Sequence, residues 1–182
     1  MCKRPIPQQS FRSTAVETVH ENPWFVVKNR DGYFTTEYEY PQVIVLPIVE
    51  NHSIVMVRAK RPVIEDITLE LPGGSAKENE TILEAASRGL KEETGITASD
   101  LDRFRMLPPI SSSPNRNPDL LSICQLSISE DEFEKRAGHD QEVDNVDCLK
   151  FEHVKSMIVC GEIYVSVPVA IIGRFFCSIR SI

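Results

Sequence analysis

The sequence contains few features of an extracellular or zinc-binding protein. Cysteine is scarce: the chain has five among its 182 residues, an odd number, and no two of them form a Cys-x-x-Cys pair. This pattern favours reduced thiols in a cytosolic protein over a disulfide framework or a zinc knuckle. The residues concerned are Cys2, Cys124, Cys148, Cys160 and Cys177.

Long apolar runs are also absent. One of the longest, Val165 to Ile172, is far shorter than the roughly 20 residues that a bilayer crossing takes. The opening MCKRPIPQQSFRS has no apolar core of the kind found in a secretory signal. We therefore expect a cytoplasmic protein without a membrane partner. The net charge of -7 argues against nucleic acid as the main partner. It would suit a site that collects divalent cations, although an acidic surface commonly reflects solubility alone.

The patterns that are present predict several strands around one long helix. Aromatic and β-branched residues on either side of Asp31-Gly32 predict a hairpin of residues 24–29 and 33–38. The length favours one domain. Its elements, in the order strands, helix, strands and helices, predict an α/β fold with a mixed sheet and helices packed on its faces. Further strands are expected in QVIVLPIVE, SIVMVRAK and ITLELPGG, and C-terminal helices in EHVKSMIVCGEI and SVPVAIIGRFF.

The long helix pattern, from Glu80 to Thr94, is rich in carboxylates. Its apolar residues recur at helical spacing, and Gly95 follows at a place where a helix end favours positive φ. Glu92 and Glu93 lie on adjacent stripes near the C-terminal end, which the helix dipole already makes negative. A hard divalent cation such as Mg²⁺ would offset that repulsion. The simpler alternative is a solvated helix face.

This segment resembles the signature of the Nudix hydrolases, G-x5-E-x7-R-E-U-x-E-E-x-G-U, in which U is aliphatic. Every fixed position but one is matched. The resemblance implies a Nudix-type α/β/α sandwich that hydrolyses nucleoside diphosphates linked to another moiety, with Mg²⁺ or Mn²⁺ as cofactor. The matching residues are Gly74, Glu80, Arg88, Leu90, Glu92, Glu93, Gly95 and Ile96.

Gly89 is the position that departs from the signature. The family has a glutamate there, which in many members binds metal and in some is the general base. A glycine inside a helix costs about 0.5–1 kcal/mol relative to alanine, so helix stability does not explain it. The alternatives are close packing, relaxed function, a site with one fewer metal, or a binding role in place of catalysis.

The resemblance extends over most of residues 18 to 176 and is greatest to the ADP-ribose pyrophosphatase branch. In that branch the N-terminal strands are exchanged across a homodimer, so residues 1–40 are expected to be a tail and dimerisation hairpin. Residues 41–182 then form the Nudix domain. Trp24 and Phe25 are expected in the core or at the dimer interface, with stacking on a substrate base as a further alternative.

Three residues near the signature acquire roles from this resemblance. Arg61, in VRAKRP, falls where an arginine commonly meets the substrate, although the segment alone would suggest an ordinary surface arginine. Glu70, in LELPGG, falls at a substrate-side position. From strand alternation it points away from its leucine neighbours, to solvent or to the site. The carbonyl of Gly73 falls at a metal-ligand position.

The resemblance also implies the chemistry, in which water attacks one phosphorus of a pyrophosphate. Metal bound by Glu92, Glu93 and the Gly73 carbonyl would neutralise the diphosphate and activate water. Glu142, on an acidic loop, is expected to be catalytic together with Glu92. From sequence Asp140 and Asp144 remain alternatives for the loop carboxylate.

The other signature residues are expected to be structural: Gly74, Glu80, Arg88 and Gly95. Arg88 would pair along the helix with Glu84 or Glu92. The rival interpretation of the whole protein is a catalytically impaired Nudix module that binds a nucleotide or a partner. The partners expected are a small nucleoside diphosphate and a second copy of the chain.

Overall fold

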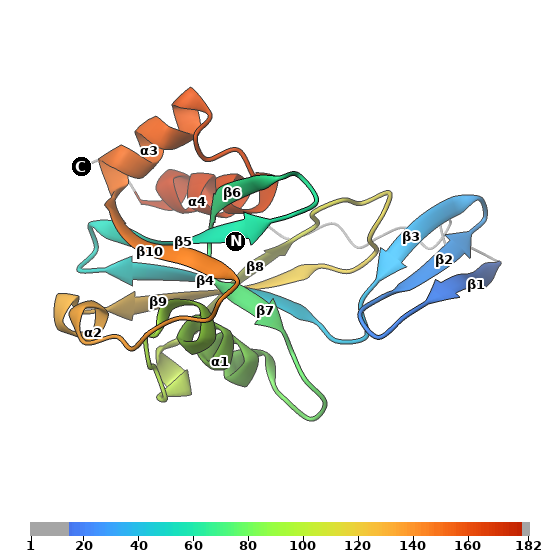
Figure 1. Ribbon diagram of the computed structural model, residues 1–182, viewed down its shortest axis with the longest axis horizontal. Helices are drawn as coiled ribbons and strands as arrows, with labels where there is room; N and C mark the ends of the chain where they lie inside the picture. Colours follow the sequence, from blue (N-terminus) through green and yellow to red (C-terminus); the bar gives the residue numbers. More distant parts are fainter. Residues whose placement is uncertain (1–14, 180–182) are drawn as a thin grey trace. The chain divides into compact units, whose positions relative to one another are not determined.

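The computed structural model describes residues 15–179. The chain divides into two compact units. One contains the residues up to Glu39 together with Ser113–Asp119, and the other contains Tyr40–Ser112 and the residues from Leu120 onward. The predicted N-terminal tail and Cys2 fall outside the described residues. Figure 1 shows the elements of both units in chain order.

The first unit is an antiparallel sheet of three strands in the order β1-β2-β3. Asp31 and Gly32 have φ of 50° and 90° and join β2 to β3, and the Gly32 amide donates to Asn29 Oδ1 at 2.8 Å. Two residues at positive φ match the right-handed twist of a tight hairpin. The hairpin predicted around Asp31-Gly32 is therefore confirmed. The strands are β1 Val16–Glu21, β2 Val26–Arg30 and β3 Tyr33–Glu37.

The second unit is built on a seven-stranded mixed sheet. Its main path runs β10-β5-β4-β9-β8, with β6 paired to β5 and β7 paired to β4. Only the β4–β9 pair is parallel among the described strands. The strands are β4 Gln42–Val49, β5 Ser53–Arg61, β6 Asp66–Glu70, β7 Gly73–Ser75, β8 Arg105–Ile110, β9 Leu121–Ile128 and β10 Val143–Lys150.

Helices cover both faces of this sheet. On one face α1 packs over a buried cluster that includes Val45, Leu90 and Leu126. On the other face α3 and α4 pack over a second cluster that includes Leu46 and Ile172. Alternate residues of β4 thus enter opposite cores, as a strand buried on both faces requires. The helices are α1 Ile82–Thr94, the 3₁₀ turn Leu101–Arg103, α2 Glu130–Glu134, α3 Phe151–Cys160 and α4 Ser166–Ser178.

The predicted α/β/α sandwich with a mixed sheet and separate N-terminal antiparallel strands is confirmed, and Figure 1 shows α1 on the opposite side of the sheet from α3 and α4. None of the helices between residues 15 and 179 combines the length and the apolar composition that a bilayer crossing needs. Helix α2 was not expected from sequence. Its signal was a capping box, in which Ser129 and Glu132 each satisfy a backbone amide of the other.

Local chemistry explains where α1 begins and ends. Thr81 is the N-cap and forms a capping box with Glu84. Gly95 ends the helix at φ 75°, and its amide donates to the Lys91 carbonyl at 2.9 Å. A β-carbon on Gly95 would also lie 2.0 Å from the Ala137 carbonyl oxygen. Any other residue would therefore be strained there twice over, by conformation and by contact.

Candidate active site

The site is built where strand β7 meets the last turns of α1. The Gly73 amide donates to Glu93 Oε2 at 2.9 Å. Gly73 is buried in β7 opposite Ile44 of β4. A loop of residues 76–81 joins the two elements. Gly73 and Glu93, both predicted as metal ligands, are thus brought into direct contact by the fold.

Glu93 is held in an environment that opposes its charge. Burial raises the pKa of its carboxyl to about 7. The hydrogen bond from the Gly73 amide acts against that rise, the charge of Asp140 adds to it, Arg61 again opposes it, and Glu70 adds to it. Glu93 therefore meets carboxylates from two other parts of the chain, Asp140 and Glu70, and only one positive charge, that of Arg61.

Arg61 and Glu70 form a pair with two hydrogen bonds at this place. Arg61 donates from Nε to Glu70 Oε1 at 2.7 Å and from Nη2 to Oε2 at 2.9 Å. The Thr68 hydroxyl donates to Glu70 Oε1 at 2.7 Å. Burial works against ionisation of Glu70, but the bonds from Arg61 and Thr68 hold its pKa below the usual value. Thr68 was missed from sequence; its signal was the Thr-x-Glu spacing, which places both side chains on one face of β6.

Arg61 interacts electrostatically with carboxylates from other parts of the site. Its pKa is raised first by the hydrogen bonds to Glu70, against burial, and then by the charges of Glu70, Glu93 and Glu142. Nη1 of Arg61 makes no hydrogen bond to any part of the chain that the structure describes. That leaves a charged donor group for an anionic ligand.

Arg88 links α1 to the loop that precedes it. It donates to Glu80 through Nε at 2.8 Å and Nη2 at 2.9 Å, to the Ser75 carbonyl at 2.7 Å, and to Glu92 Oε2 at 2.7 Å. Of the two helix partners predicted for Arg88, the structure has Glu92. The other carboxylate bound by Arg88 is Glu80, because Glu84 caps the helix. Glu92 is half exposed, with Lys77 Nζ at 4.0 Å. Gly74, in the middle of β7, pairs with Val43 of β4.

The acidic loop before β10 is tied to the end of α1. The Asp140 amide donates to the Glu92 carbonyl at 2.9 Å. Asp140 Oδ1 accepts from the amides of Glu142 and Val143 at 3.0 and 3.2 Å. Asp144 lies 3.9 Å from Lys60 Nζ. The three carboxylates therefore differ: Asp140 orders the loop, Asp144 lies within β10 and faces a lysine, and the Glu142 carboxylate has no hydrogen-bond or ion-pair partner among residues 15–179.

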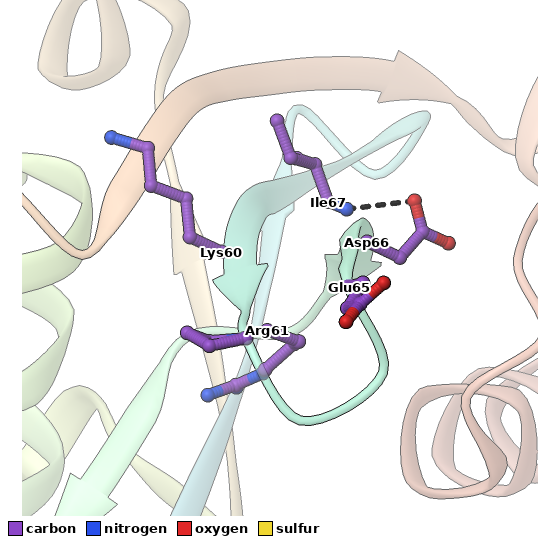
Figure 2. Close-up of a pocket in the computed structure, with 6 residues that line it drawn as sticks. Lys60, Arg61, Glu65, Asp66 and Ile67 are labelled. Atoms are coloured by element: carbon purple, nitrogen blue, oxygen red, sulfur yellow. Dashed lines mark hydrogen bonds between the residues drawn. The ribbon is translucent and has the colours of Figure 1, made fainter.

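An open cavity of about 310 Å³ lies at the β5–β6 turn, beside Arg61. Figure 2 shows the Lys60 and Arg61 side chains extending away from Asp66, which accepts from the Ile67 amide at 2.7 Å. Across the turn the Tyr164 hydroxyl donates to Asp66 Oδ2 at 2.5 Å. The cavity is lined by Lys60, Arg61, Pro62, Glu65, Asp66 and Ile67.

Position 89 contributes no ligand. A β-carbon on Gly89 would lie 2.4 Å from the Gly73 carbonyl oxygen. Within residues 15–179 no three His, Cys, Asp or Glu side chains are grouped so that they could hold a metal ion. The donors present are the Gly73 carbonyl, Glu93 and the half-exposed Glu92. All are hard oxygen ligands, and the surplus of negative charge around Glu93 fits one divalent cation that takes its other ligands from phosphate and water.

Comparison with known sequences gives three further findings. A model of the NUDIX domain matches residues 40–160. The chain is 30% identical over 139 residues to an ADP-ribose pyrophosphatase of Methanocaldococcus jannaschii, and the match covers 71% of this chain and 79% of that protein. It is 28% identical over 125 residues to an ADP-ribose pyrophosphatase of Bacillus subtilis, and this match covers 67% of this chain and 64% of that protein.

A solved structure shares the fold. The crystal structure of an ADP compounds hydrolase superposes with a TM-score of 0.66 at 20% identity, covering 90% of this chain and 91% of that one. At this identity the likeness shows the arrangement of strands and helices alone.

Proposed function

The chain belongs to the NUDIX domain family, and from this premise we propose that it is a pyrophosphohydrolase of nucleoside diphosphate derivatives such as ADP-ribose. The similarity to two proteins named ADP-ribose pyrophosphatases supports this substrate class. The reaction is attack of water on one phosphorus of the diphosphate. From ADP-ribose it would release AMP and ribose 5-phosphate.

The observation that carries the proposal is the position of Glu93. It is mostly buried on α1, accepts a hydrogen bond from the Gly73 amide, and lies in the field of Arg61, Glu70 and Asp140. A carboxyl with a strongly raised pKa, set among charged groups from several elements, is a frequent mark of a functional site. In a purely structural ion pair, the positive partner would lower the pKa of the carboxyl instead of leaving it raised.

A divalent cation, Mg²⁺ or Mn²⁺, would be held by Glu93, the Gly73 carbonyl and Glu92, and it would neutralise the diphosphate and lower the pKa of water. Arg88 occupies Glu92 Oε2, and Glu92 Oε1, with Lys77 Nζ at 4.0 Å, is the oxygen that we assign to the cation. We assign substrate binding to Arg61, whose Nη1 makes no hydrogen bond within residues 15–179 and whose charge interacts with Glu93 and Glu142. Glu70 then orients that guanidinium.

Glu142 is the loop residue that we assign as general base. Asp140 uses Oδ1 to order the loop, and Asp144 lies close to Lys60. Glu142 alone of the three is left free to take a proton from water, and its charge acts on Arg61. A positioned general base contributes about 10²–10⁴-fold to rate. Loss of a metal ligand at position 89 therefore leaves the proposed base in place.

For the first unit we propose a role in forming a homodimer. Its sheet exposes several large apolar side chains, and Trp24 is 76% exposed, so the core position considered for Trp24 is wrong. Sedimentation of the full chain should show a dimer, and Trp24→Asp should shift it toward monomer. Val159→Asp, at an exposed site on α3 of the other unit, is the control and should leave the dimer intact. A cytoplasmic location and the absence of a nucleic-acid partner remain predictions from sequence.

The test of the activity is phosphate release, coupled to a phosphatase, from ADP-ribose, nucleotide sugars, dinucleotides and nucleoside triphosphates, with Mg²⁺ and with Mn²⁺. We expect metal-dependent turnover of ADP-ribose that is lost in Glu93→Gln and kept in Glu78→Gln, which alters an exposed loop carboxylate. No turnover of any compound, with nucleotide binding retained in a thermal-shift assay, would reject the hydrolase in favour of a binding module.

A further inference from the structure

Gly89 lies inside α1 at a point where the helix touches strand β7. A β-carbon on Gly89 would lie 2.4 Å from the Gly73 carbonyl oxygen and 2.9 Å from its carbonyl carbon. In protein structures a β-carbon essentially never lies closer than 3.0 Å to such a non-bonded heavy atom. The obstacle is backbone, which cannot rotate away as a long side chain can. Helix and strand therefore approach so closely because position 89 has no side chain.

Gly73 cannot move aside, because it is confined on its other face as well. A β-carbon on Gly73 would lie 2.3 Å from the Val43 carbonyl oxygen in β4. Next to it, the Val45 amide donates to the Pro72 carbonyl at 2.8 Å. Three backbone segments, β4, β7 and α1, thus lie in contact through two glycines (Figure 1). Close packing of this kind transmits a change at one layer to the next.

The same contact sets the geometry of the candidate active site. Residue 73 meets α1 twice: its carbonyl lies over Gly89, and one helical turn further on its amide donates to Glu93 at 2.9 Å. A side chain at position 89 would displace the Gly73 carbonyl, and the amide of the same residue would move with it. The Glu93 carboxylate would then lose its backbone hydrogen bond.

We propose that Gly89 is a positioning residue, which holds Gly73 against α1 so that the Gly73 amide orients Glu93. It follows that this chain cannot regain the glutamate of the family signature by substitution at position 89 alone, because the Gly73 carbonyl fills the space which that side chain would enter. The proposal concerns the geometry of the site, and only its catalytic consequence rests on the proposed function.

Helix α4 offers a matched control. Gly173 is also inside a 13-residue helix, and a β-carbon there would meet nothing within 4 Å. From helix propensity alone, both glycine-to-alanine changes should stabilise the protein. We expect Gly173→Ala to raise the Tm of the metal-free chain by about 1–4 °C. We expect Gly89→Ala to lower it by about 3–10 °C, because the added methyl overpacks a backbone contact.

A second measurement separates the positioning role from a loss of stability alone. Amide hydrogen exchange of Gly73, followed by NMR, should be at least about tenfold faster in Gly89→Ala than in Gly173→Ala under conditions where both are folded. The proposal is overturned if both alanine variants raise the Tm alike, or if the Gly73 amide exchanges at the same rate in both.

Titration with Mn²⁺ alone tests whether a carboxylate introduced at position 89 can bind metal. Gly89→Glu should bind Mn²⁺ no more tightly than the unaltered chain. Tighter binding with an unchanged Tm would contradict the proposal. If Gly89→Glu does not fold, the collision with Gly73 is supported and the Gly89→Ala exchange rate decides. None of these readouts needs turnover, so an inactive protein would refute the proposed hydrolase and leave this assignment standing.

Discussion

Two arginine–glutamate pairs, one in each unit, are built on the same plan. In the N-terminal sheet Arg30 donates from Nε and Nη2 to Glu37 at 2.8 and 3.0 Å. In the candidate site Arg61 makes the same two bonds to Glu70 at 2.7 and 2.9 Å. In both, a threonine two residues before the glutamate donates its hydroxyl to Oε1, at 2.8 and 2.7 Å.

The strand registers are also the same. Glu37 faces Val26, and Glu70 faces Val57. Two residues beyond the valine, Lys28 faces Thr35 and Ala59 faces Thr68. Arg30 and Arg61 follow after two more residues. The middle residue of this face is the one that differs: it is Lys28 in the N-terminal sheet and Ala59 in the site. Lys28 adds a second cation, 3.0 Å from Glu37. At the site there is no such cation, and Arg61 lies in the field of further carboxylates.

Hydrogen-bond geometry alone therefore does not distinguish a functional site from a structural ion pair. The pair with Lys28 has two cations for one carboxylate: chiefly through the bonds from Arg30, and despite burial, the pKa of Glu37 falls to about 2. The pair at the site has one arginine for several carboxylates, which leaves a demand for positive charge that a cation can meet. Charge balance therefore separates a structural pair from one that can serve a ligand.

The largest effect should come from removing each arginine. Arg61→Ala should lower kcat/KM for ADP-ribose about 10²-fold, because it removes a charged donor to the diphosphate and releases Glu70. Arg30→Ala should change kcat/KM less than about threefold in enzyme that remains folded. Steady-state kinetics of both variants checks this. Equal losses would show that the two pairs do not differ in function.

Replacing each glutamate by glutamine should reverse the ranking for stability. Glu37→Gln leaves Arg30 and Lys28 without their partly buried anion, and should cost about 1–3 kcal/mol in the opening free energy of the N-terminal sheet. Glu70→Gln also weakens the bond to Arg61, but it relieves repulsion with Glu93 and should cost less than about 1 kcal/mol. Hydrogen exchange of β2–β3 and β5–β6, read by mass spectrometry, distinguishes the two. A larger loss for Glu70→Gln would contradict the account of charge balance.

Most of the elements were predictable from sequence because their signals are local. The Asp31-Gly32 turn, Gly95 and Gly161 each stand where the chain itself needs positive φ, and the structure has φ of 50°, 90°, 75° and 83° there. The residue spacing of α1 likewise depends only on residues within a few turns. Such features are set before tertiary packing acts.

The remaining features depend on contacts between distant residues. The collision that explains Gly89 involves Gly73, whose position is set by β4 on its other side. Sequence left open whether Glu70 faces solvent or the site. The β5–β6 register, which places Ala59 opposite Thr68, puts Arg61 within reach of Glu70. The sequence assigns Glu92 and Glu93 to adjacent stripes but does not indicate that Glu93 is mostly buried while Glu92 turns to Arg88.

The two units should respond to pH in opposite directions. The pKa of Glu37 is lowered from 4.5 to about 2, so its stabilisation is present above pH 4.5 and is lost as the pH falls toward 2, by about 1.5 kcal/mol. The pKa of Glu93 is raised to about 7, so the folded state holds more protons than the unfolded state between pH 4.5 and 7. Stability of the metal-free chain should therefore fall as the pH rises through that window.

Hydrogen exchange across pH 2.5–7.5 in EDTA, corrected for intrinsic rates, checks both directions. Lys28→Ala should move the acid loss of β2–β3 to higher pH, since it makes that pair resemble the one at the site. Glu93→Gln should remove the decline above pH 4.5 and leave the acid limb unchanged. A decline that persists in Glu93→Gln would place the titrating group elsewhere.

The smallest effect should come from the two threonines, and it separates structure from function most cleanly. Thr35 and Thr68 are 6% and 1% exposed and donate equivalent bonds. Valine keeps the shape and removes one hydroxyl, so each change should cost about 1 kcal/mol. Thr35→Val should leave kcat unaltered, whereas Thr68→Val frees Glu70 and, through it, Arg61, and should raise KM about two- to fivefold. If both variants lose stability and neither changes KM, Glu70 needs no restraint, and the shared hydrogen-bond plan is structural in both units.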